Sequence, residues 1–160
     1  MESAIRIRRL APGDANAILA VQTLCPELAP WSGRDYEAMT DGNTVGWVAE
    51  LVAGNAKNDA ARPDSIAGFI TARVAANEIE ILNLGVAPDA RRKRIATALL
   101  KAAVAWGTEN HAQKAFLEVR TSNSAAIQFY ERAGFQTVGR RANYYTSPVE
   151  DALQLVAKIS

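Results

Sequence analysis

The sequence predicts a mixed α/β (α+β) fold, with a central mixed sheet of about seven strands flanked by about four helices. Three observations predict it. Short segments alternate apolar and polar residues, as half-buried strands do. The middle of the chain, residues 45–86, indicates an antiparallel meander of such segments. Farther on, a strand, a helix and a second strand follow one another, which is typical of a parallel crossover.

Strands are expected first at residues 4–10, where Ile5 and Ile7 alternate with arginines. Asp14 is a plausible N-cap for a helix that runs to Leu24. Ser32 and Asp35 have capping-box spacing and open a second, short helix. The remaining segments of this half are strands at 45–51, 66–75 and 79–86, with an exposed hairpin loop at 52–65.

The second half begins with an amphipathic helix over residues 94–110, followed by a strand at 116–120. Asn123 or Ser124 can cap a helix over 125–133, and Gly134 suits the position after its end. The last segments are strands at 135–139 and 151–159, joined by a basic, aromatic loop at 140–145.

Composition limits the classes of function. The chain has 160 residues, 49% of them hydrophobic, which predicts a single domain over residues 1–160. A net charge of +1 gives no general argument for a nucleic-acid or membrane partner. Cys25 is the single cysteine, so no intramolecular disulfide can form, which fits a cytoplasmic protein. A small buried role is favoured for it over a nucleophilic one. With one histidine besides, no metal site is expected, and neither a signal peptide nor a membrane-spanning run is evident.

A basic turn at the start of the 94–110 helix predicts an anion site. The strand that ends near Val86 is followed by four cations in a row, Arg91, Arg92, Lys93 and Arg94. A helix start presents unpaired N–H groups and the positive end of its dipole, which suits a phosphate or pyrophosphate. A solvated basic loop that merely caps the helix is the alternative.

This stretch, VAPDARRKRIATALL, resembles the acetyl-CoA-binding signature of the GNAT N-acetyltransferases. Ile95 and Ala96 stand at its aliphatic and final small positions, and Arg94 replaces its central glycine. The resemblance implies that residues 91–96 wrap a pyrophosphate with backbone amides. A residue other than glycine loses conformational freedom there if the position requires φ > 0. The predicted order of strands and helices is also that of the GNAT fold.

A second block, LEVRTSNSAAIQFYERAGF, is similar to the RimI group of this family, the bacterial ribosomal-protein-alanine N-acetyltransferases. The resemblance implies that Glu118 is the general base, Tyr130 the general acid and Asn123 a coenzyme ligand. Physically, a partly dry carboxylate is a stronger base, and a phenol can protonate a leaving thiolate. The alternatives are a same-face Glu118–Arg120 ion pair, an idle Tyr130 hydroxyl and a simple Asn123 helix cap.

In the family, a backbone amide of a bulged strand polarises the thioester carbonyl. The matching segment is Leu84-Gly85-Val86, and either the Val86 or the Leu84 amide could serve. The RimI likeness also implies that Trp31, Tyr144 and Tyr145 line the acceptor entrance; ordinary packing is the alternative.

These observations predict an acetyl-CoA-dependent transferase that acts by direct attack in a ternary complex. An α-amino group has a pKa of about 8 and a lysine about 10.4, so deprotonating the α-amine takes about 3 kcal/mol less work. The expected acceptor is therefore a protein N-terminus, the N-terminal alanine of a small-subunit ribosomal protein, with the enzyme a monomer or weak dimer. A transferase for a lysine or a small amine, and a non-catalytic acyl-CoA sensor, are the alternatives.

Overall fold

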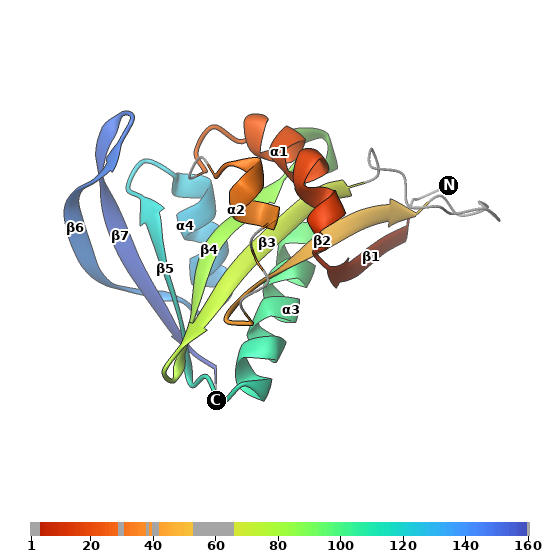
Figure 1. Ribbon diagram of the computed structural model, residues 1–160. Coiled ribbons are helices and arrows are strands. Elements are labelled where there is room, and N and C mark those ends of the chain that lie inside the picture. The colour runs from red at the N-terminus through yellow and green to blue at the C-terminus, as the bar shows by residue number, and fades with distance from the viewer. Residues whose placement is uncertain (1–3, 29–30, 38, 40–41, 53–65, 160) are drawn as a thin grey trace. The chain divides into compact units, whose positions relative to one another are not determined.

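The computed structural model describes residues 4–28, 31–37, 39, 42–52 and 66–159. Within these residues seven strands form one sheet, which confirms the predicted mixed sheet of about seven strands. The order of neighbouring strands is β1-β2-β3-β4-β5-β7-β6 (Figure 1). The strands are β1 (Ala4–Arg9), β2 (Thr44–Val52), β3 (Ile66–Ala75), β4 (Glu78–Val86), β5 (Lys114–Arg120), β6 (Gln136–Thr146) and β7 (Val149–Lys158). The helices are α1 (Ala15–Thr23), α2 (Gly33–Glu37), α3 (Ile95–Glu109) and α4 (Ser124–Arg132), with 3-10 turns η1 (Pro12–Asp14) and η3 (Pro88–Ala90). In this described part of the chain, none of the helices has the length and apolar character needed to cross a membrane.

The chain divides into two compact units. The first comprises Met1–Ala72 and Asn83–Ala103, and the second comprises Arg73–Leu82 and Val104–Ser160. Strands β3 and β4 and helix α3 each contribute residues to both units. The expectation of a single domain over residues 1–160 stays a prediction.

The core of the first unit forms where α1 and α2 bury their apolar residues. Ile18 of α1, Tyr36 of α2 and Phe69 of β3 are each at most 1% exposed. Tyr36 meets Phe69 edge-on, with ring centroids 5.7 Å apart. The predicted capping box is present, because the Ser32 amide donates to Asp35 at 2.7 Å. The helical spacing of the apolar residues thus explains why these helices bury one face in the core.

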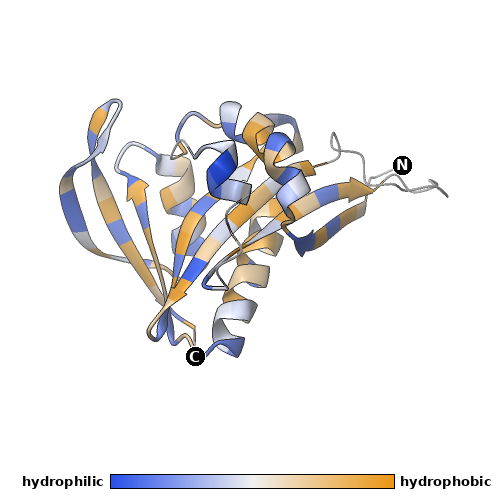
Figure 2. Ribbon diagram, in the orientation of Figure 1, coloured by the Kyte–Doolittle hydropathy of each residue, from blue (hydrophilic) through white to orange (hydrophobic). Residues whose placement is uncertain are grey.

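Strand β1 lies antiparallel to β2, in a register from Ala4↔Val52 to Arg9↔Trp47. Polar and apolar residues alternate along β1, as Figure 2 shows. Its arginines reach a buried carboxylate: Arg8 Nε lies 2.6 Å and Arg6 Nε 2.9 Å from Glu50. Arg8 also donates to Asp14 at 2.7 Å, so the Asp14 carboxylate binds an arginine rather than capping α1. One ion-pair network therefore joins β1, β2 and the start of α1.

This network controls the charge state of two buried acids. Burial by itself would raise the pKa of Glu50, but the hydrogen bonds from Arg8 and Arg6 outweigh it and hold the pKa below its usual range. Burial acts on Asp14 in the same way, and Arg8 and the Ala11 amide likewise lower its pKa. Both groups are therefore ionised throughout the neutral pH range.

The second unit contains the predicted crossover. Strand β4 pairs in parallel with β5 from Glu78↔Lys114 to Ile81↔Leu117, which confirms the strand-helix-strand interpretation. Strand β7 then pairs antiparallel with β5, and β6 with β7, so these three strands lie side by side in Figure 1. Along β5 the alternate residues Ala115, Leu117 and Val119 are buried.

The predicted loop at residues 140–145 is wrong, because these residues belong to β6. Pairing with β7 continues past Arg141 after a register shift, and Asn143 takes a φ of +53° there. Asp151 accepts the Asn143 amide at 2.9 Å and so supports this irregularity. A bulge of this kind mixes turn-like residues into a strand, which hides the strand pattern from the sequence. Of the loop predicted at residues 52–65, Val52 belongs to β2, and residues 53–65 lie outside the described residues.

Lowering the pH should destabilise the protein as Asp14 and Glu50 take up protons. Because both folded-state pKa values are lowered, their contribution is fully present above about pH 5 and is lost as the pH falls through the lowered values. We expect Glu50→Gln to reduce the free energy of unfolding at neutral pH by about 3 kcal/mol, because Arg6 and Arg8 lose a buried partner. The variant should also show a flatter pH dependence in urea denaturation.

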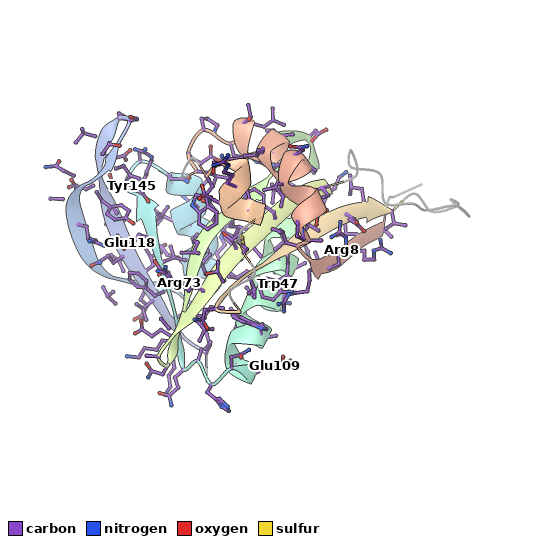
Figure 3. The ribbon with its side chains drawn as sticks, in the orientation of Figure 1. Arg8, Trp47, Arg73, Glu109, Glu118 and Tyr145 are labelled. Atoms are coloured by element: carbon purple, nitrogen blue, oxygen red, sulfur yellow. The ribbon has the colours of Figure 1, made fainter. Side chains whose placement is uncertain are left out.

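The matched control is Glu109→Gln on α3, whose exposed side chain Figure 3 labels. It should leave both quantities unchanged. Equal stability of the two variants across the pH range would contradict this account of the network.

Candidate active site

Glu118 of β5 carries a carboxylate with one satisfied and one unsatisfied oxygen. Its side chain is 9% exposed. Oε1 accepts a hydrogen bond from Nη1 of Arg141 at 3.0 Å. Oε2 is buried and has no hydrogen-bond partner among the described residues. Buried polar atoms are normally paired, and unpaired ones are found at catalytic sites, so this oxygen is a candidate proton acceptor.

Strand register brings Arg141 to Glu118 across β7. Glu118 of β5 and Gly139 of β6 both pair with Gln154 of β7. In the next row, Arg141 pairs with Ala152. Cross-strand partners share a face of the sheet, and so do residues two apart on one strand. All five residues therefore lie on one face, which allows Arg141 to reach Glu118 across β7.

Two tyrosines of β6 lie beside this ion pair. The guanidinium carbon of Arg141 is 4.8 Å from the ring centroid of Tyr144, which is 44% exposed. Tyr145 packs edge-on against Tyr144, with centroids 5.0 Å apart, and Arg120 stacks on it at 4.2 Å. Figure 3 labels Tyr145 and Glu118 in this unit. Burial raises the pKa of Tyr145 to about 12, so its phenol is protonated at neutral pH.

The alternative of a Glu118–Arg120 pair is wrong. Arg120 instead bonds to Glu150 of β7 at 3.2 Å. Glu150 also accepts the Ser122 amide at 2.6 Å and the Thr121 hydroxyl at 3.0 Å. Hydrogen bonds from Ser122 are the main reason that the pKa of Glu150 falls to about 2. The permanently charged Glu150 therefore holds the turn that leads from β5 into α4.

Helix α4 carries the two other candidates of this unit. Asn123 caps it, since its side chain accepts the Ala126 amide at 3.2 Å. Tyr130 is buried and packs edge-on against Phe135, with ring centroids 5.3 Å apart. Burial, with a smaller effect of Tyr145, raises the pKa of Tyr130 above its usual range. The phenol is therefore protonated at neutral pH, as a proton donor requires.

The first unit holds the basic turn. Arg92 and Arg94 have φ values of +68° and +60°, and α3 begins directly afterwards at Ile95. Its first helical hydrogen bond runs from the Ala98 amide to the Arg94 carbonyl at 3.1 Å. The amides of residues 95–97 therefore precede the helical ladder. Left-handed residues beside a helix N-terminus direct successive N–H groups toward one point, which favours an anion.

The four cations differ in their contacts. Arg91 turns back onto its own unit, with Nε 3.2 Å from the Val86 carbonyl and Nη2 3.5 Å from Glu27. The same nitrogen lies 3.7 Å from the sulfur of Cys25. Arg92, Lys93 and Arg94 are exposed. Arg91 thus fastens the turn to the end of β4. Cys25 is 1% exposed and its pKa is raised by burial, which confirms the small buried role.

Gly85 is required by packing. A Cβ atom there would lie 2.7 Å from Leu28 and 3.1 Å from Phe69. Leu84 and Val86 flank it within β4 and are half-buried. The bulge expected at Gly85, and the choice of amide as oxyanion donor, stay predictions.

Trp31 packs in the first unit against Tyr36, with ring centroids 5.3 Å apart. Its carbonyl accepts Nε2 of Gln22 at 2.9 Å. This is the packing role that the sequence left open. Trp31 belongs to a different unit from Tyr144 and Tyr145, so its place at an acceptor entrance stays a prediction.

The candidate residues therefore form two groups, each within one unit. The second unit brings together Glu118, Tyr144 and Tyr145 and adds Arg141, which sequence reasoning did not select. Its signal was present in the Arg140-Arg141-Ala142-Asn143-Tyr144-Tyr145 run, but the run was interpreted as a loop. The first unit holds residues 84–86, the turn at 91–96 and Trp31. Among the described residues, no cluster of three or more His, Cys, Asp or Glu side chains could hold a metal ion.

Comparison with known proteins assigns the family. The model of the Acetyltransferase (GNAT) family matches residues 17–135, about three quarters of the chain. The chain belongs to the GNAT family. The match includes the turn before α3, Glu118 and Tyr130, whereas Arg141, Tyr144 and Tyr145 lie beyond its end.

Individual relatives agree with this assignment. The chain is 36% identical over 97 residues to the [ribosomal protein bS18]-alanine N-acetyltransferase of Escherichia coli, covering 59% of this chain and 66%, just under two thirds, of that relative. An N-alpha-acetyltransferase of Sulfurisphaera tokodaii is 29% identical over 166 residues, covering 96% and 93% of the two chains. The crystal structure of the ribosomal-protein-S18-alanine N-acetyltransferase from Escherichia coli superposes with a TM-score of 0.76 at 28% identity, covering 98% of this chain and 95% of that one.

The positive φ of Arg94 gives a test of this GNAT turn. A left-handed conformation costs a residue with a Cβ atom about 1–2 kcal/mol, and glycine escapes this cost. We expect Arg94→Gly to exceed Arg94→Ala in free energy of unfolding by about 1 kcal/mol, although both lose the same guanidinium. Chemical denaturation measures the difference. A more stable alanine variant would show that position 94 does not require φ > 0.

Proposed function

We propose that the chain is an acetyl-CoA-dependent N-acetyltransferase that modifies the N-terminal α-amino group of a protein. The observation that carries this proposal is the Glu118 carboxylate, with one oxygen held by Arg141 and the other buried and unpartnered among the described residues. A transferase of this family needs a base for the acceptor amine, and this oxygen has the burial and free lone pairs of one.

In the proposed reaction, Oε2 of Glu118 accepts a proton from the acceptor amine, directly or through one water. The amine nitrogen forms a bond to the acetyl carbonyl carbon while the carbon–sulfur bond breaks. Tyr130 gives its phenolic proton to the departing sulfur, so the products are an amide and a thiol. The amide of Val86 or Leu84 stabilises the carbonyl oxygen as its negative charge develops. Proton transfers through solvent restore Glu118 and Tyr130.

The turn before α3 fits the coenzyme. Its two left-handed residues and the amides of residues 95–97, which precede the helical ladder, suit a pyrophosphate, and Arg92, Lys93 and Arg94 are exposed beside them. Arg91 acts differently from the other three, since its guanidinium is bound to Val86 and Glu27. Asn123, besides capping α4, is proposed as a further coenzyme ligand.

The acceptor follows from the chemistry of amines and from the relatives. A single carboxylate can deprotonate an α-amine, with its pKa of about 8, far more readily than a lysine near 10.4. The Escherichia coli relative is named for the alanine of ribosomal protein bS18, and the archaeal relative for N-alpha-acetylation. We take the N-terminal alanine of a ribosomal protein as the acceptor, in the cytoplasm, with Tyr144, Tyr145 and Trp31 at the entrance.

Release of coenzyme thiol from acetyl-CoA, measured against a panel of acceptors, tests this assignment. The panel holds short peptides that begin with Ala, Ser, Met or Gly, an N-blocked lysine peptide and a polyamine. Preference for the peptide with N-terminal alanine is the expected result. Turnover only with lysine or the polyamine would overturn the acceptor. Coenzyme binding without any turnover would favour a sensor.

The roles of the two catalytic residues can be separated from binding. We expect Glu118→Gln to lower kcat by about 100-fold or more, with the acetyl-CoA dissociation constant within about twofold, because the amide cannot accept the proton. Tyr130→Phe keeps the packing against Phe135 and should lower kcat while leaving stability nearly unchanged. Steady-state kinetics and calorimetric binding provide the measurements. An unaltered kcat in Glu118→Gln would remove Glu118 from the mechanism.

A further inference from the structure

We infer that Arg141 is the positioning residue of the Glu118 base: it holds Oε1 and the negative charge so that Oε2 alone receives the acceptor's proton. This inference rests on the proposed function and adds a residue to it.

The geometry of the ion pair carries the first step. Nη1 of Arg141 donates to Oε1 of Glu118 at 3.0 Å, whereas Oε2 stays buried without a partner among the described residues. A carboxylate fixed through one oxygen keeps a single rotamer and presents the other oxygen in a constant direction. Such fixation matters because a base misplaced by about 1 Å can cost about 100-fold in rate.

The surroundings of Arg141 carry the second step. Its guanidinium carbon lies 4.8 Å from the ring centroid of Tyr144. This cation–π contact restricts the positions that the guanidinium group can adopt. Behind it, Asp151 binds Nε of Arg140 at 2.7 Å and the amide of Asn143 at 2.9 Å. These bonds hold the β6 irregularity on both sides of Arg141. The backbone that directs Arg141 toward Glu118 is therefore itself supported.

The other titratable groups near Glu118, among the described residues, are neutral or paired elsewhere. Tyr144 and Tyr145 of β6 have raised pKa values and stay neutral at neutral pH. Arg120 is paired with Glu150, whose pKa of about 2 keeps it ionised. On β4, the negative charge of Glu80 helps to raise the pKa of Tyr144, and Glu80 is itself paired with Arg73 at 2.5 Å. Gln154 of β7, in register with Glu118, is uncharged.

The test compares Arg141→Gln, Arg141→Lys and the control Arg132→Gln. Arg132 is an exposed arginine in the last turn of α4, so the control makes the same chemical change in the same unit. With acetyl-CoA and the preferred peptide, we expect Arg141→Gln to lower kcat by about 10- to 100-fold, with the acetyl-CoA dissociation constant unchanged. The value of kcat/KM should fall by the same factor as kcat, which marks an interaction lost in the transition state rather than in substrate binding. Arg141→Lys keeps the charge and should recover most of both effects.

Each other outcome counts against the inference. If Arg141→Gln has the same kinetics as Arg132→Gln, the inference about Arg141 is overturned. The proposed function would still stand, because the wild-type protein turns over. A lower kcat accompanied by weaker acetyl-CoA binding, or an Arg141→Lys variant no better than Arg141→Gln, would show a merely structural role. If Arg141→Gln does not fold, the kcat of Arg141→Lys decides: a value close to wild type supports the inference, and a value as low as that of Glu118→Gln overturns it. Absence of wild-type turnover with every acceptor would overturn the proposed function and this inference together.

Discussion

The hydrogen bond between Arg141 and Glu118 is the interaction on which the proposed chemistry depends. A buried carboxylate is costly unless it is paired, and a fully paired one has no lone pair left for catalysis. Glu118 avoids both problems. Arg141 donates a hydrogen bond to Oε1, and Oε2 has no partner among the described residues. The sheet makes this possible because β7 pairs with both β5 and β6 in a register that places Glu118 and Arg141 on one face.

Two turns that carry other residues of the proposed site are held by local contacts. The turn before α3 combines two left-handed residues with a helix N-terminus, and Arg91 ties it to the carbonyl of Val86. In the other unit, Glu150 holds the turn before α4, the helix that carries Tyr130. In each turn one charged residue, Arg91 or Glu150, is bound to its own neighbourhood. The exposed cations at 92–94 are the ones that we propose for the anion.

Most elements could be predicted from the sequence, because their apolar period and caps are local signals. Examples are the alternation in β1, the Ser32–Asp35 capping box and the Asn123 cap. Tyr130 and the basic turn were selected through local motifs. The extension of β6 and the role of Arg141 were missed, because they depend on pairing with β7 and on a bulge supported by Asp151. Likewise, a pair with Arg120 was the alternative weighed for Glu118, whereas register across three strands brings Arg141 to it.

The central claim is that Glu118 deprotonates an α-amine rather than a lysine. One peptide that carries a free N-terminal alanine and an internal lysine places both amines in the same competition. After incubation with acetyl-CoA and the wild-type protein, fragmentation mass spectrometry locates the acetyl group. The account predicts acetylation of the alanine nitrogen, and none in the Glu118→Gln variant under the same conditions. Acetylation confined to the lysine, or equal acetylation by the Glu118→Gln variant, would contradict it.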